Sequence, residues 1–198
     1  MDATPEIEPH AHHRTGHKRL DMILAVCALL VSLVSVVLGI ENAIAMRQLV
    51  AASSWPYVNV GVSNGNAEGG AALNLLVQNK GVGPAKVKSL EVFYDGKPME
   101  GEEALMRTLT GGKPVPIVRS RVVGSVLSAD ETVHFLSVPT HSVPEGDLLQ
   151  MAKLSEKITI RTCYCSAFDE CWVTDRTVKP ATSAEVDECP AVAVPFQG

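Results

Sequence analysis

Four cysteines near the C-terminal end offer the clearest chemistry in this 198-residue chain. They are Cys163, Cys165, Cys171 and Cys189, while the fifth cysteine, Cys27, lies far away in an apolar segment. Thiols this close either pair as disulfides or, as thiolates, bind a soft metal such as zinc. An even number of cysteines in an exported domain favours two disulfides, because in an oxidising compartment the thiols pair before they meet a metal.

The run Lys157–Cys165 alternates like a β-strand and narrows the pairing of these cysteines. Cys163 and Cys165 share one face of that strand. Residues two apart on a strand have Cα atoms near the upper limit for a disulfide, so each should bond elsewhere. Residues 166–170 can form a hairpin loop that brings Cys171 opposite Cys165. Among the three connectivities we favour Cys165–Cys171 with Cys163–Cys189. A redox or metal-dependent protein that uses Cys163, Cys165 and Cys171 is the alternative.

Other side chains suited to catalysis are scattered. His134 lies in a strand-like run and His141 in a loop flanked by proline, so we expect both at the surface. The motifs G-x-S-x-G and H-E-x-x-H and the P-loop are absent. Adjacent carboxylates on a strand point to opposite faces and do not act as an acid–base pair. The sequence therefore predicts no catalytic site and no cofactor.

The N-terminal tail, residues 1–20, holds a cluster of four histidines: His10, His12, His13 and His17. Imidazoles two to five residues apart can converge on a transition metal. So short and polar a tail is expected to be disordered, which would leave any metal site weak and open to solvent. We expect a solvated cytoplasmic tail, and metal binding by the histidines stays open.

The segment Met22–Ile40 has nineteen residues and no charge. At ~1.5 Å per residue, a helix of this length covers roughly the ~30 Å hydrocarbon core of a bilayer. We predict a transmembrane helix over residues 21–41, with the helix continuing to about residue 52. A cleaved signal peptide is the alternative, since residues 43–45 read Ala-Ile-Ala, but signal peptides have apolar stretches of only ~7–15 residues.

The charges beside this segment predict its orientation. Arg14, Lys18 and Arg19 precede it, whereas Glu41 follows it and Arg47 is the first basic residue beyond. Cytoplasmic flanks carry the excess of Lys and Arg, so the N-terminus should be cytoplasmic and the remainder exported. With the disulfides, this predicts a single-pass protein of a bacterial inner membrane whose C-terminal domain is periplasmic.

Short runs of alternating apolar residues, separated by turn residues, fill the exported part. The runs begin near residues 57, 73, 85, 131, 157 and 171, and Asp95-Gly96 is a typical hairpin turn. Short helices are predicted over residues 100–109 and 144–156. About seven strands with one or two helical insertions predict a mainly β fold, an antiparallel immunoglobulin-like β-sandwich over residues 53–180. Residues 181–198 should form a poorly ordered C-terminal extension that is fixed only at Cys189.

Residues 79–85 read Asn-Lys-Gly-Val-Gly-Pro-Ala, between two alternating strands. This turn resembles the N-x-G-x-G-P-A turn of extracytoplasmic β-sandwich domains in uncharacterised bacterial single-pass inner-membrane proteins. The short tail, the apolar segment and the Trp55-Pro56-Tyr57 strand start are similar too. The resemblance covers roughly residues 20–100. It implies a fold and a location, and it brings no activity and no catalytic residue. We expect a strand hairpin whose small residues let two strands approach closely.

One stripe of small residues marks the apolar helix: Ala25, Ala28, Ser32, Ser35 and Gly39. Their spacing of 3, 4, 3 and 4 places them on one side of the helix, where a second helix can approach closely. A chance alignment of small residues is the alternative.

The predicted partners are the lipid bilayer and another membrane helix, in a homodimer or in a cell-envelope complex. Nucleic acid is not expected, because residues 42–198 carry 14 basic and 17 acidic residues without a basic stripe. We therefore expect a non-enzymatic, membrane-anchored interaction module.

Overall fold

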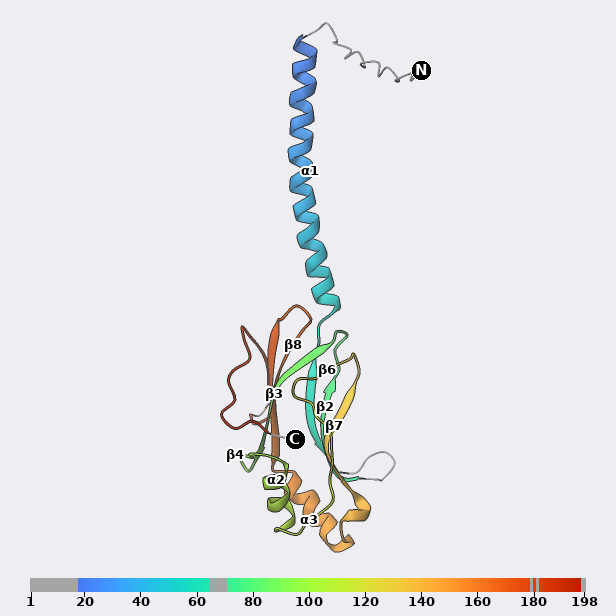
Figure 1. Ribbon diagram of the computed structural model, residues 1–198, viewed down its shortest axis with the longest axis vertical. Helices are drawn as coiled ribbons and strands as arrows, with labels where there is room; N and C mark the ends of the chain where they lie inside the picture. Colours follow the sequence, from blue (N-terminus) through green and yellow to red (C-terminus); the bar gives the residue numbers. More distant parts are fainter. Residues whose placement is uncertain (1–17, 65–70, 179, 181, 197–198) are drawn as a thin grey trace, which may run out of the picture. The chain divides into compact units, whose positions relative to one another are not determined.

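The computed structural model describes residues 18–64, 71–178, 180 and 182–196 (Figure 1). The chain divides into two compact units, Met1–Leu49 and Val50–Gly198. All but the last three residues of the predicted N-terminal tail lie outside the described residues, and so do His10, His12, His13 and His17.

Helix α1 (Lys18–Ser53) has 36 residues and is long and apolar enough to span a membrane. It begins three residues before the predicted start at residue 21 and continues past residue 41, as expected. None of its residues is buried. The prediction of a long apolar helix near the N-terminus is therefore confirmed.

The Val50–Gly198 unit contains two antiparallel sheets. The first has the order β1-β2-β7-β5, formed by β1 (Val58–Ser63), β2 (Ala71–Asn79), β7 (Thr132–Pro139) and β5 (Val118–Arg119). Val58 and Val60 alternate with less buried residues along β1, because successive side chains of a strand point to opposite faces. The same alternation in the sequence predicts a strand at this position, which β1 confirms.

The second sheet has the order β10-β9-β8-β3-β4, and β6 also pairs with β3. Its strands are β10 (Thr182–Val186), β9 (Cys171–Asp175), β8 (Ile158–Cys165), β3 (Ala85–Tyr94), β4 (Lys97–Pro98) and β6 (Val126–Leu127). Asp95 and Gly96 join β3 to β4 with positive φ angles of 51° and 76°, the backbone of a tight hairpin. The predicted turn is therefore confirmed.

Three short helical segments lie between strands: α2 (Glu102–Thr110), the 3-10 turn η1 (Thr140–Ser142) and α3 (Glu145–Ser155). Both predicted helical insertions are thus present, with boundaries shifted by one or two residues. Apolar side chains of both sheets and of α2 and α3 form one buried cluster. Figure 1 shows the two helices together at one end of the sheets.

The turn at residues 79–85 corrects one expectation from the sequence. It is not a hairpin, because β2 belongs to the first sheet and β3 to the second. The small residues instead let the turn pack against the segment that follows α1. A Cβ atom on Gly83 would overlap with the carbonyl oxygen of Ser54, and one on Gly81 would overlap with backbone atoms of residues 55–57.

The fully buried side chain of Asn79 holds this contact together. The two hydrogens of its amide nitrogen are shared among the carbonyl oxygens of Gly83, Leu127 and Ser128 at 2.7, 3.3 and 3.0 Å. Its Oδ1 atom accepts hydrogen bonds from the backbone N–H groups of Tyr57 and Gly81 at 3.3 and 3.0 Å. One side chain thus satisfies backbone groups of three chain segments.

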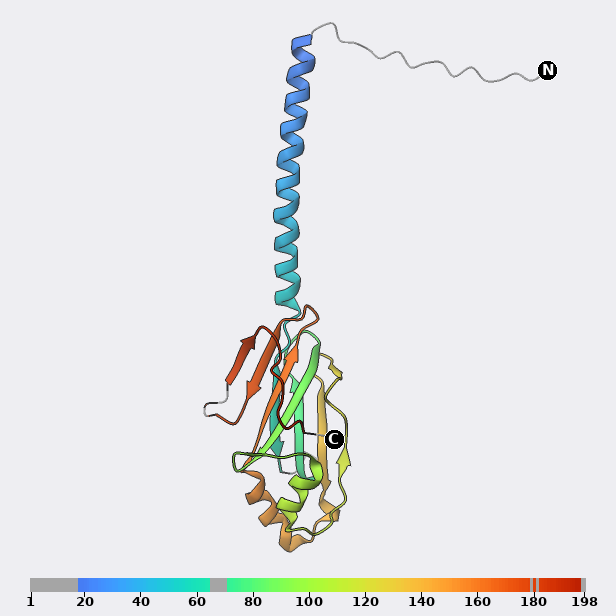
Figure 2. The ribbon, with the colours of Figure 1, turned by 60° about the vertical axis from the view of Figure 1, so that its left-hand side comes forward.

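The C-terminal segment also differs from expectation. The predicted poorly ordered extension, residues 181–198, contains strand β10, which pairs with β9 over five residues (Figure 2). Farther along, Phe196 is only 5% exposed and its ring lies 6.0 Å from that of Phe135. The backbone N–H of Phe196 donates to the carbonyl oxygen of Leu90 at 3.1 Å. The segment is therefore part of the β domain.

We predict that Gly83→Ala lowers the free energy of unfolding by about 3 kcal/mol, because a methyl group has no room against Ser54. Gly61→Ala is the control: its Cβ would meet Leu76 at an ordinary 3.8 Å, so a change below ~1 kcal/mol is expected. Urea unfolding of the full chain in mild detergent, followed by tryptophan fluorescence, measures both. Equal effects of the two substitutions would contradict the close approach.

Candidate functional site

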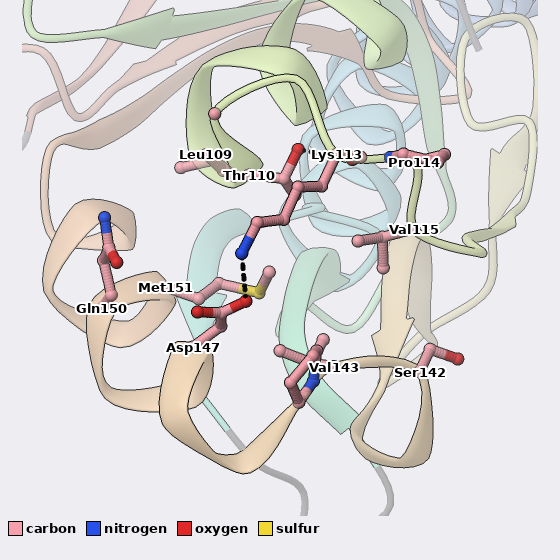
Figure 3. Close-up of a pocket in the computed structure, with 12 residues that line it drawn as sticks. Leu109, Thr110, Lys113, Pro114, Val115, Ser142, Val143, Asp147, Gln150 and Met151 are labelled. Carbon is pink, nitrogen blue, oxygen red and sulfur yellow. Dashed lines mark hydrogen bonds and ion pairs between the residues drawn. The ribbon is translucent and has the colours of Figure 1, made fainter.

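A pocket of about 400 Å³ lies between the end of α2, the loop after it and the start of α3 (Figure 3). Pockets that hold small ligands measure ~300–1,000 Å³ and are largely apolar with a few placed polar groups. Leu109, Val143 and Met151 form a buried apolar surface in the pocket, and Val115 adds a partly buried one. This combination makes it the best candidate for a binding site in the Val50–Gly198 unit.

Lys113 reaches the pocket because α2 ends in two glycines. Gly111 and Gly112 have φ angles of 63° and 86°, which residues with a side chain rarely adopt. The N–H of Gly112 donates to the carbonyl oxygen of Arg107 at 2.9 Å and closes the helix end. The hydroxyl of Thr110 donates to the carbonyl oxygen of Lys113 at 2.7 Å. These contacts turn the chain back and hold the Lys113 backbone beside the pocket.

Asp147 lies opposite, in the first turn of α3. Its backbone N–H donates to the carbonyl oxygen of Pro144 at 2.8 Å. A carboxylate in the first turn of a helix is favoured by the helix dipole. The Nζ of Lys113 lies 2.8 Å from Oδ2 of Asp147, so one positive and one negative group meet at the pocket (Figure 3). Their side chains are 67% and 36% exposed.

The four C-terminal cysteines come together as two neighbouring disulfides. The Sγ atoms lie 2.00 Å apart for Cys163 and Cys189 and 2.12 Å apart for Cys165 and Cys171. This is the pairing that the strand geometry favours, and Cys165 and Cys171 face each other across the β8–β9 hairpin. Sγ of Cys165 also lies 3.8 Å from Sγ of Cys189, so the two disulfides touch. Sγ atoms of Cys165, Cys171 and Cys189 all lie within 4.8 Å of one another, as the ligands of a metal would.

Glu102 is the one buried carboxylate among the described residues, at 4% exposure. Burial raises the pKa of its carboxyl group, although the nearby Arg119 guanidinium lowers it in part. Oε2 lies 3.4 Å from Nη1 of Arg119, while Oε1 has no hydrogen-bond partner among the described residues. A raised pKa suits a proton donor. His134 and His141 are both exposed, as expected, and neither imidazole has a hydrogen-bond or ion-pair partner in the described part of the chain.

The five small residues Ala25, Ala28, Ser32, Ser35 and Gly39 all lie on α1 and are exposed. At 100° per residue they fall on a stripe about 80° wide. The hydroxyl of Ser35 donates to the carbonyl oxygen of Val31 at 2.8 Å, within its own helix. Such a hydroxyl is satisfied in an apolar surrounding and keeps a lone pair for a neighbouring helix.

Sequence reasoning missed the pocket. Lys113 and Asp147 are separated by 34 positions, and neither belongs to a recognisable motif. The Gly111-Gly112 pair signals a helix end, but nothing in the sequence shows that the following lysine faces α3.

The chain belongs to the family described as Domain of unknown function (DUF8453), whose model matches residues 22–179. No curated protein matches the chain. The matched region covers most of α1 and the β domain as far as β9, so the family joins the apolar helix to the β domain.

We predict one titratable thiol per chain, that of Cys27, when the protein is denatured without reductant. A thiol-specific reagent added in a denaturing detergent measures the number. A Cys27→Ser variant is the control and should give no signal. Two or more further thiols in freshly isolated protein would contradict the disulfides.

Proposed function

We propose that the chain is a non-enzymatic, membrane-anchored interaction module, an accessory subunit of a bacterial cell-envelope complex. The observation that carries this proposal is the stripe of small residues on α1. Helices associate in lipid through close packing at small residues, since lipid tails are as apolar as leucine side chains. A helix that served only as an anchor would need no such stripe, so a second membrane helix is the proposed partner.

The proposed location is the inner membrane, with the N-terminus in the cytoplasm and the β domain in the periplasm. Lys18 and Arg19 stand at the N-terminal end of α1, and the excess of basic residues lies on this side. The two disulfides support the same orientation, because disulfides persist in oxidising compartments and are rare in the bacterial cytoplasm.

We further propose that the β domain is an immunoglobulin-like sandwich of the kind found in uncharacterised single-pass inner-membrane proteins. The order β1-β2-β7-β5 corresponds to the A-B-E-D sheet of that fold, and β9-β8-β3 corresponds to G-F-C. The domain departs from antibody domains in its disulfides, since three of the four cysteines lie on β8 and β9 of one sheet.

A periplasmic thiol- or metal-dependent redox protein is the second candidate. The observation that favours it is the 3.8 Å separation of Sγ in Cys165 and Cys189. Upon reduction, thiolates this close are placed to exchange disulfides or to hold a soft metal. The thiol titration distinguishes the two candidates, because a redox protein isolated from the cell would contain a reduced fraction.

We expect a periplasm-reporting enzyme fused after Gly198 to be active and a cytoplasm-reporting enzyme at the same position to be silent. Both expected results follow from the orientation that the positive-inside rule predicts. The opposite result would overturn the proposed orientation and the periplasmic location together.

The interaction itself is tested by Ala28→Leu with Ser35→Leu in the full chain. The change keeps α1 apolar, so insertion should survive, while the larger side chains push a packed neighbour away. We expect recovery of the partner from mildly solubilised membranes to fall about tenfold, as the loss of ~1.4 kcal/mol would cause. Two differently tagged copies of the chain report a homodimer, and mass spectrometry of the recovered proteins reports a different subunit.

Leu30→Val with Val37→Leu is the matched control. These positions lie about 180° from the stripe on α1, and the exchange conserves composition. The control should retain the partner. Equal recovery with both variants would show that the stripe is an accident of composition.

A further inference from the structure

We propose that the pocket between α2 and α3 binds a free α-amino acid with an apolar side chain. This inference goes beyond the proposed interaction module and does not depend on it. It rests on three features of the pocket: its apolar floor, its single pair of opposite charges and the rigid attachment of both charged residues.

The floor selects an apolar side chain. Leu109, Val143 and Met151 are 3%, 6% and 3% exposed, so the pocket reaches the edge of the buried cluster. An apolar group placed here leaves water and contacts side chains that are already held in place. Burial of a leucine-sized side chain is worth ~1.5–3 kcal/mol, which is enough for selection among amino acids. A volume of about 400 Å³ is at the small end for ligand pockets and has room for a single amino acid.

The charged pair matches the two charges of an amino acid. The ammonium group of Lys113 suits the ligand carboxylate, and the carboxylate of Asp147 suits the ligand ammonium group. The pair must open to admit the ligand, and this opening is cheap because exposed ion pairs contribute only ~0–1 kcal/mol. With the ligand bound, two charge-assisted hydrogen bonds replace one. A ligand with a single charge would leave Lys113 or Asp147 without its partner.

Both charged residues are attached to fixed backbone. Lys113 follows the closed end of α2, and Asp147 lies in the first turn of α3. The ligand therefore orders two side chains but no loop, which keeps the entropic cost of binding low.

A second hollow, of about 690 Å³, lies beside β3 and the C-terminal segment, but it carries Lys88 and Arg121 without an acidic lining residue. Its charge does not match a zwitterion. This difference in charge distinguishes the second hollow from the α2–α3 pocket.

Isothermal titration calorimetry of the full chain in mild detergent tests the proposal. The ligands are L-leucine, L-methionine and L-phenylalanine, with L-glutamate as a polar comparison. Two analogues of leucine, 4-methylpentanoate and isopentylamine, each retain one charge. We expect at least one apolar amino acid to bind about tenfold more tightly than either analogue. No heat from any of the three at ~10 mM, or equal binding of the analogues, would overturn the proposal.

Lys113→Gln and Asp147→Asn should each weaken binding about tenfold, because each removes one charge-assisted hydrogen bond. Both are surface changes that leave the fold intact. Asp95→Asn and Lys157→Gln are the controls, since these residues form another exposed pair, 3.8 Å apart, outside the pocket. Val115→Phe, which narrows the pocket, should weaken binding. Unchanged binding in the Lys113, Asp147 and Val115 variants would place the ligand elsewhere and overturn the proposal.

Discussion

The buried amide group of Asn79 fixes how the chain enters the β domain. Its two polar atoms bond to backbone groups of residues 57, 81, 83, 127 and 128, so three segments meet at one side chain. The bonds to the carbonyl oxygens of Gly83 and Leu127 are buried, and each of these two groups would cost ~1–3 kcal/mol without a partner. An apolar side chain cannot satisfy them. The crossing from the first sheet to the second and the start of β1 therefore depend on this one residue.

The segment that enters the β domain beside Asn79 also contacts the strands that carry the disulfides. The ring of Trp55 lies 6.4 Å from that of Trp172 on β9, which in turn stacks on Tyr164 of β8 at 5.8 Å. These two strands carry Cys163, Cys165 and Cys171. Because Cys163 is bonded to Cys189, the chain beyond β10 is held against the second sheet. Phe196 is then close enough to be buried in the core. The contacts that begin at Asn79 therefore continue to the C-terminal segment.

The sequence predicted what is decided locally. Alternation of apolar residues revealed the strands, and the Asp95-Gly96 turn needs only the backbone of two residues. The sequence did not reveal β10, because Thr-Ser-Ala-Glu-Val is polar and becomes a strand only by pairing with β9. It also misjudged the turn at Gly81 and Gly83, since the segment against which these glycines pack lies more than 20 positions earlier. Contacts between distant segments leave no periodic pattern in the sequence. The Lys113–Asp147 pair could not be predicted for the same reason.

The pocket lies at a place where the charged side chains contribute little to the stability of the fold. Leu105 and Leu109 of α2 belong to the core, so one side of this helix is fixed by packing. Its C-terminal loop and the start of α3 face solvent, and an exposed ion pair there adds little stability. Asn79 and the cysteines are explained by the fold, whereas Lys113 and Asp147 are not. Such residues are held in place by the fold but are not required for its stability, so they can change to suit a ligand. Binding sites therefore occur often at such positions.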